Sequence, residues 1–102
     1  MNNVTTILIR KALKSSCRYR VAAIALDKRG VPLAYAMNSP RFSKPHGGEH
    51  AEIAVMKKVS IERVKTILIA RVNKAGDLLP IHPCETCERV ATKYGIKIKT
   101  IA

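Results

Sequence analysis

The stretch PCETC at residues 83–87 decides how the rest of this sequence is interpreted. Its cysteines, Cys84 and Cys87, stand three positions apart, and the chain has only one further cysteine. A helix that begins at Pro83 or Cys84 places both sulfurs on one face, so that they can meet a common metal ion. An odd number of cysteines without an export signal argues against a disulfide framework. A thioredoxin-type redox couple is disfavoured, because that motif follows a first strand and this one follows the third expected strand.

Length and composition indicate one small folded domain that spans residues 1–102. Hydrophobic residues make up 47% of the chain, which is enough for a packed core. The apolar runs at 21–26 and 66–70 are too short to cross a bilayer. The N-terminus shows no small-residue cleavage site. We therefore expect a soluble, cytoplasmic protein with no membrane partner.

The net charge is unusually high for a chain of 102 residues. Nineteen Lys and Arg residues stand against seven Asp and Glu, which gives a formal charge of +12. The basic residues are spread along the chain, which indicates a basic surface rather than a basic tail. Such a surface favours a phosphate-bearing partner, either a nucleotide or a nucleic acid. The alternative is a solvated surface that only maintains solubility.

Hydrophobic spacing predicts the order α-β-β-α-β-α-β. The expected helices span 4–14, 50–58 and a segment from Pro83 or Cys84 onwards, and the expected strands span 19–27, 31–38, 64–72 and 96–101. Loops are expected at 39–49 and 73–83. The side chains expected to face the core are Val4, Ile7, Leu8 and Ala12 in the first helix, and Cys87, Val90, Ala91 and Tyr94 in the last. Gly95 should end the last helix in the left-handed conformation.

The order of these elements predicts a three-layer α/β/α sandwich with a mixed sheet of about four strands. Strands 64–72 and 96–101 are separated by a helix, so they should pair in parallel through a right-handed crossover. The continuous apolar run at 21–26 should be covered on both faces. Lys97 and Lys99 alternate with isoleucines, which is typical of an edge strand with one wet face.

A second motif, HAE at 50–52, opens the helix before this crossover and supplies the other half of a metal site. His50, Cys84 and Cys87 are soft-to-borderline ligands that suit Zn²⁺. On a regular helix, His50 and Glu52 would point roughly 200° apart. They can therefore serve one site only if it lies over the helix end. Three protein ligands leave a fourth position for water, which is typical of a catalytic zinc, and Glu52 is the carboxylate placed to take its proton.

A structural zinc site is the alternative, and it would need a fourth protein ligand. The available side chains are Cys17, His46 and His82. Cys17 is more simply explained as a small buried residue. His46 is expected in a solvated loop, and His82 at the rim of the pocket. The catalytic interpretation is favoured because the carboxylate and both helix starts also fit it.

The pattern H-x-E followed by P-C-x-x-C is typical of zinc nucleobase deaminases. The sequence resembles the cytidine deaminase-like superfamily over nearly its whole length. The matching segments are SSCRYRVAAIALDKRG, AMNSP, HAEIAVM and PCETCERV. The resemblance implies that Asn38 contacts the sugar of the substrate and that the N–H of Ala51 contacts the base. Asn38 could equally be a turn residue, because NSP is turn chemistry.

Two further expectations concern the surroundings of the pocket. Phe42, flanked by Arg41 and Lys44, could stack on a base, or it could anchor its loop to the domain. Familiar members of the superfamily continue into a fifth strand and often a further helix, whereas this chain stops with its fourth expected strand. We therefore expect a homo-oligomer in which a neighbouring subunit supplies the missing wall.

The function predicted from these residues is zinc-dependent hydrolytic deamination. The base is expected to be cytosine, presented on a nucleotide or on single-stranded nucleic acid, with Glu52 as the proton carrier. Adenosine deamination in tRNA is the alternative among enzymes. A nucleic-acid-binding module with a purely structural zinc, or an inactive relative, is the alternative from other classes.

Overall fold

The computed structural model describes residues 3–15, 20–38 and 50–101. Its elements follow the expected order, with one short strand added. In chain order they are α1 (Asn3–Leu13), β1 (Arg20–Leu26), β2 (Pro32–Met37), α2 (Ala51–Met56), a 3-10 turn (Ile61–Arg63), β3 (Thr66–Val72), β4 (Leu78–Leu79), α3 (Glu85–Lys93) and β5 (Lys97–Thr100).

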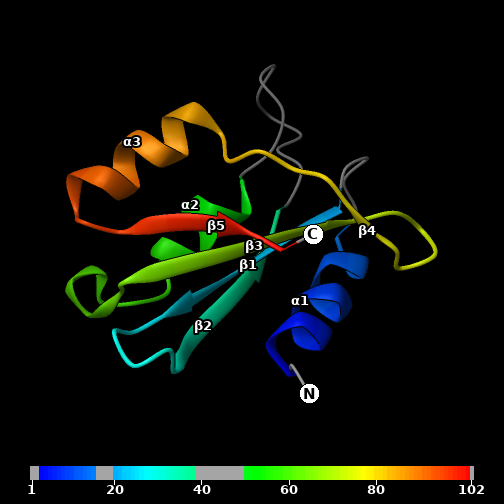
Figure 1. The fold of residues 1–102 in the computed structure, drawn as a ribbon, viewed down its shortest axis with the longest axis horizontal. Helices are drawn as coiled ribbons and strands as arrows, with labels where there is room; N and C mark the ends of the chain where they lie inside the picture. The colour runs from blue at the N-terminus through cyan, green and yellow to red at the C-terminus, as the bar shows by residue number, and fades with distance from the viewer. Residues whose placement is uncertain (1–2, 16–19, 39–49, 102) are drawn as a thin grey trace.

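The strands form one mixed sheet in the order β2-β1-β3-β4, with β5 also paired to β3 (Figure 1). β1 is antiparallel to β2 and to β3. β5 is parallel to β3, and Thr66 pairs with Lys97. The expected parallel pairing across a helical crossover is thereby confirmed.

β4 corrects the expectation of a plain loop at 73–83 and of about four strands. Asn73 begins a tight turn, because its Oδ1 accepts hydrogen bonds from the N–H groups of Ala75 and Asp77. Gly76 takes the positive φ of 87° that this turn requires. The turn lays Leu78 against Val72. A two-residue strand is too short to show the alternation by which strands are recognised in a sequence.

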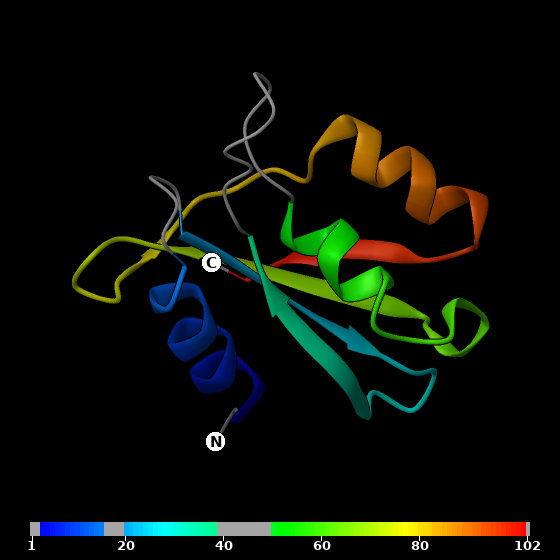
Figure 2. The same cartoon turned by 180° about the vertical axis from the view of Figure 1, so that it is seen from behind.

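Helices cover both faces of the sheet, which confirms the three-layer sandwich (Figures 1 and 2). On one face, Ala23 and Ala25 of β1 pack in a cluster with residues of α2 and α3. On the other face, Ala22 and Ile24 pack with Leu8 and other residues of α1. Alternate residues of one apolar strand therefore fill two separate cores, as the run at 21–26 predicts.

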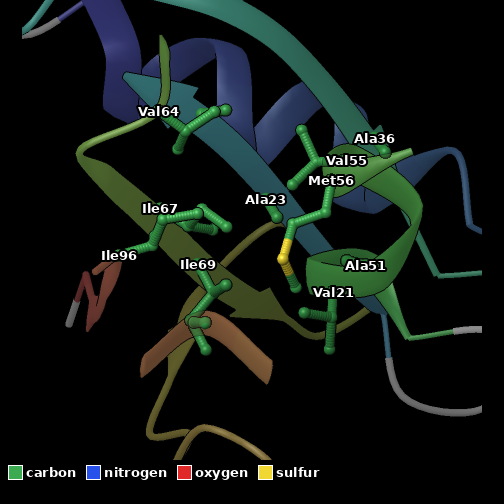
Figure 3. Close-up of a cluster of buried hydrophobic side chains, with 12 residues drawn as sticks. Val21, Ala23, Ala36, Ala51, Val55, Met56, Val64, Ile67, Ile69 and Ile96 are labelled. Atoms are coloured by element: carbon green, nitrogen blue, oxygen red, sulfur yellow. The ribbon is translucent and has the colours of Figure 1, made fainter. Parts of the chain in front are cut away.

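The core on the α2 side joins segments that are far apart in the chain. Figure 3 shows Val55 and Met56 of α2 in one cluster with Ala23 of β1 and Ile67 of β3. Ala51 is fully buried at the start of the same helix. This packing fixes the first turn of α2 over the sheet, where the HAE motif lies.

Two side chains differ from the expected inward stripes. Tyr94 is 49% exposed, because α3 ends at Lys93 and the chain turns away there; the expected stop at Gly95 is confirmed by its φ of 73°. In α1, Ile9 rather than Ile7 packs against the α1-side core. The β3–β4 turn lies close to Ile9: a Cβ at Gly76 would lie 3.9 Å from its Cγ2.

β5 has the character expected of an edge strand. Lys97 and Lys99 are exposed, and Ile98 is half-buried against the α2-side core. Charged side chains along an edge oppose pairing with other chains. Across the described part of the chain, no helix has the length and apolar character needed to traverse a membrane.

Candidate metal centre and active site

His50 stands at the N-cap of α2. This position explains how its side chain can reach the same site as that of Glu52. The backbone of His50 is extended, with φ −72° and ψ 146°, while its carbonyl oxygen already accepts a hydrogen bond from the N–H of Ala54. Because a cap residue does not follow the helical period, His50 and Glu52 need not point to opposite sides. His50 is exposed, whereas Glu52 is only 4% exposed.

Cys84 occupies the same position in α3. It is the N-cap, with φ −62° and ψ 133°, and its carbonyl oxygen accepts the N–H of Glu88. Cys87 lies one turn further on and is 2% exposed. Both thiols are free. Figures 1 and 2 show that α2 and α3 start at the same end of the sheet, so the two motifs meet there.

Three potential ligand atoms converge between the helix starts. Sγ of Cys87 lies 3.5 Å from Nδ1 of His50, and the donor atoms of His50, Cys84 and Cys87 all lie within 4.8 Å of one another. With metal–ligand bonds of about 2.0–2.3 Å, a tetrahedral zinc holds its donors roughly 3.3–3.8 Å apart. The observed spacing is thus within a small side-chain adjustment of such a site. Within the described residues, this is the group of His, Cys and acidic side chains that could hold a metal.

The chemistry of the donor set also fits a cation. Burial, the negative charge of Glu52 and the neighbouring Cys84 together raise the pKa of the Cys87 thiol to about 12. The Cys87 thiol therefore ionises near neutral pH only when a compensating positive charge lies beside it. A bound divalent metal supplies that charge, because cysteine coordinates as the thiolate. The two sulfurs and one imidazole nitrogen favour zinc over the harder cations.

A cavity of about 320 Å³ opens beside this group. The cavity is lined by residues of the HAE and PCETC motifs, by residues in or next to β1, β2 and β3, and by the segment before α3. These residues are Val21, Asn38, His50, Ala51, Glu52, Arg71, Ile81, His82 and Cys84. A volume of this size is sufficient for a small organic molecule. The buried carboxylate of Glu52 therefore faces a space that a substrate can enter.

Of the three residues expected to bind substrate, two line this cavity. Asn38 and Ala51 do so, and their roles stay predictions. Phe42 lies outside the described residues, as do Cys17 and His46. His82 is exposed and lines the cavity without joining the group of three ligand atoms, in agreement with a position at the rim.

Asn38 is held by contacts that the sequence did not indicate. Its Oδ1 accepts a hydrogen bond of 2.6 Å from the hydroxyl of Ser15 and one of 3.1 Å from the N–H of Val21. Ser15 is 4% exposed and lies 23 residues away along the chain. No local pattern in the sequence can reveal such a pairing, and it orients the carboxamide at the cavity wall.

Two residues at or next to the cavity were not predicted from the sequence: Ser15, which holds Asn38, and Arg71. Arg71 lies on β3 and lines the cavity. A signal for it was present: Ile67 and Ile69 face the α2-side core, so alternation places residue 71 on that same face.

Comparison with solved structures identifies this architecture. The cytidine deaminase from Mycobacterium tuberculosis superposes with a TM-score of 0.65 over 93% of this chain and 80% of its own, at 20% identity. The chain has a cytidine deaminase-like fold. The cytidine deaminase from Mycobacterium leprae gives a TM-score of 0.66 at 17% identity, over 94% of this chain and 83% of its own. That from Burkholderia pseudomallei gives 0.65 at 17% identity, over 99% and 87%.

At the level of sequence alone, neither protein-family models nor curated proteins give a match. The likeness is therefore one of fold, and it confirms the resemblance predicted from the two motifs. In this cytidine deaminase-like fold, the His, Cys and Cys side chains that could hold a metal lie at the starts of α2 and α3.

Proposed function

We propose that this protein is a zinc-dependent hydrolytic deaminase that acts on a cytosine-type base. The observation that carries the proposal is one arrangement: His50, Cys84 and Cys87 bring their donor atoms within 4.8 Å of one another, and the buried Glu52 lines the cavity beside them. Structural neighbours of the same fold are named cytidine deaminases. The substrate base is carried on a nucleotide or on single-stranded nucleic acid, to which a chain of charge +12 is attracted.

His50, Cys84 and Cys87 would hold the zinc ion. When bound, zinc supplies a water acidic enough to act as a nucleophile near neutral pH. The free thiols of Cys84 and Cys87 suit a reducing compartment, in agreement with a cytoplasmic protein.

Glu52 carries the protons of the reaction. It takes one proton from the attacking water as the oxygen bonds to the ring carbon that bears the amine, and it delivers that proton to the adjacent ring nitrogen. It then assists transfer of the second proton to the departing nitrogen as the carbon–nitrogen bond breaks. Water and cytosine become uracil and ammonia, so the atoms balance without a further reactant. Burial beside the cavity keeps bulk water away from the carboxylate during these steps.

Ala51 and Asn38 orient the substrate. Ala51 is the first residue of α2, so its N–H has no intrahelical acceptor and can donate to the base. The carboxamide of Asn38 contacts the sugar, and its orientation is set by Ser15 and Val21. Stacking of the base by Phe42 stays a prediction.

The active form is a homo-oligomer. β2 is an edge strand, and its Tyr35 and Met37 are each 37% exposed. Apolar side chains along an unpaired edge are suited to contact another copy of the chain.

The direct test is to measure ammonia release from cytidine, deoxycytidylate, an adenosine-containing tRNA and single-stranded DNA. The zinc-loaded protein should deaminate one of the cytosine substrates, and removal of zinc by a chelator should abolish the activity. Release of ammonia from tRNA adenosine alone would instead identify the alternative enzyme. Binding of nucleic acid without ammonia release from any substrate would support a structural zinc.

A further inference from the structure

A second cavity, of about 490 Å³, lies between two segments at the end of the sheet away from the candidate metal centre. One wall is the β1–β2 turn, residues 27–29, and the other is the segment 62–65, which leads from the 3-10 turn into β3. The described residues that line it include two acids, Asp27 and Glu62, and four exposed basic residues. We call these four the turn patch: Lys28, Arg29, Arg63 and Lys65.

Hydrogen bonds fix both walls of this cavity. In the turn, the carboxylate of Asp27 accepts hydrogen bonds of 2.8 and 2.9 Å from the N–H groups of Arg29 and Val31. The N–H of Lys65 donates to the carbonyl oxygen of Leu26 at 2.8 Å, which joins the second wall to the end of β1. The basic side chains of the turn patch therefore extend from backbone positions that are held relative to one another.

The two walls bring their positive charges close together. The N–H of Val31 lowers the pKa of Asp27, and the guanidinium groups of Arg29 and Arg63 lower it as well. One carboxylate is thus flanked by a cation from each wall. Because two acids cannot neutralise four basic residues, the cavity keeps a positive potential that attracts anions.

The positive charge continues across this end of the sheet. β5 lies beside β3, and the N–H of Lys97 donates to the carbonyl oxygen of Lys65 at 3.2 Å. Lys97 and Lys99 are both exposed. Figures 1 and 2 show the β1–β2 turn, the 3-10 turn and the start of β5 at the same end of the molecule. Neighbouring strands lie roughly 4.8 Å apart, so basic residues from β1, β3 and β5 form a row roughly 10 Å wide.

We propose that the turn patch binds the phosphate backbone of a nucleic acid. It is separate from the candidate active site, because the β1–β3 pairing runs from Val21 and Arg71 at the active-site cavity to Leu26 and Thr66 beside the patch. Five residues of β1 cover this interval, which is roughly 17 Å. The inference therefore concerns a second site and does not require deaminase activity.

The form of the patch favours a nucleic acid over other anions. A backbone presents one phosphate after another, so it can engage several cations of the row at once and release a counterion at each contact. A free nucleotide brings its phosphates to one point. The flat surface of an anionic membrane cannot enter the concave space between the two walls, whereas a phosphate of a nucleic acid can.

The test measures binding of a short fluorescein-labelled single-stranded DNA, and of RNA of the same sequence, by fluorescence anisotropy at several salt concentrations. Each phosphate contact adds about 0.7 to the slope of log affinity against log salt. Arg63→Gln and Arg29→Gln should each weaken binding and lower that slope by about 0.7, and the double variant should lower it by about 1.4. Arg63→Lys keeps the charge and should restore the slope.

Lys74→Gln is the matched control. It removes an equal charge from an exposed position between β3 and β4, outside the turn patch, and should leave the slope unchanged. Equal changes in Lys74→Gln and Arg63→Gln would show that only net charge matters, which would overturn the inference. Binding to vesicles of anionic phospholipid or to inorganic pyrophosphate, with none to DNA or RNA, would also contradict it.

The binding measurement separates this inference from the proposed function. Patch variants that lower the slope support the nucleic-acid site even if no substrate releases ammonia, in which case only the deaminase proposal fails. A zinc-loaded protein that releases ammonia from cytidine but binds neither DNA nor RNA would keep the deaminase proposal and remove the nucleic-acid site.

Discussion

The two faces of the sheet are built from the same strands, yet they differ in what they bury. On the α1 face, Leu8, Ala12, Ala22 and Ile24 are fully buried, and the core there is apolar. The α2/α3 face begins in the same way but ends in Glu52, a buried carboxylate. Burial of a carboxylate and thiols costs free energy that an apolar core does not. The α1 face thus stabilises the fold, whereas one end of the other face holds the buried ionisable groups on which the proposed function depends.

Loss of either cysteine should have the largest effect. Cys84→Ser and Cys87→Ser should each reduce bound zinc from one per chain to nearly none and abolish ammonia release, because two remaining ligands hold zinc poorly. Atomic absorption on the purified variants measures the metal. Cys17→Ser is the matched control and should retain zinc. Loss of zinc in Cys17→Ser would identify a fourth protein ligand and a structural site.

Truncation of a buried side chain on the α1 face should lower the stability of the fold without changing zinc binding. Ile24→Ala should lower the free energy of unfolding by about 2–5 kcal/mol, because it leaves a cavity in a fully buried site. Ile24→Val should lower the free energy of unfolding by about 0.5–1.5 kcal/mol. This milder variant should stay folded even if Ile24→Ala does not. Urea unfolding measures both variants. Folded Ile24→Val should bind zinc as the unaltered protein does, and a loss of zinc there would show that the two faces are not separable.

Ser15 connects the two faces, since it follows α1 and donates to Asn38 at the cavity. Ser15→Ala should lower kcat/KM roughly tenfold, because Asn38 loses a hydrogen bond of 2.6 Å that orients it. KM should rise more than kcat falls if Asn38 contacts the sugar. Ser60→Ala removes an exposed hydroxyl that bonds Glu62 and should leave kinetics unchanged. Unaltered KM in Ser15→Ala would argue against a substrate role for Asn38.

A smaller effect should appear in the pH dependence of the metal-free protein. The pKa of the Cys87 thiol is raised from 9.0 to about 12 in the folded state, chiefly by burial. The protonated thiol therefore contributes stability that is complete below pH 9 and is lost as the pH rises toward 12. Thermal unfolding after chelation should show this decline as the pH rises from 9.0 toward 12, and Cys87→Ser should show less of it. An identical decline in both proteins would assign the effect to other groups.

The parts of the site that the sequence predicted are those with a local signal. Cys84 and Cys87 follow helical spacing, and both motifs start helices, so their convergence could be expected. The cap geometry of His50 explains why it can share a site with Glu52, which regular helical spacing alone argued against. The contact between Ser15 and Asn38 depends on tertiary folding and left no local trace.

The fold was predictable for a similar reason. The long apolar strands and the crossover helix show clear periodicity, whereas β4, with two residues, shows none. Tyr94 was wrongly placed because the helical stripe was continued one residue past the end of α3. The alternation of Ile67 and Ile69 could have predicted which face of the sheet Arg71 lies on, although its being basic did not set it apart from the other basic residues of the chain.

The most direct test of the central claim measures zinc and ammonia in the same sample of Glu52→Gln. The amide matches the carboxylate in shape but cannot carry a proton between water and base. Zinc should stay at one ion per chain, while ammonia release from the preferred cytosine substrate falls roughly 10²- to 10⁴-fold. Ammonia release at the unaltered rate, or loss of the zinc together with the activity, would contradict the account.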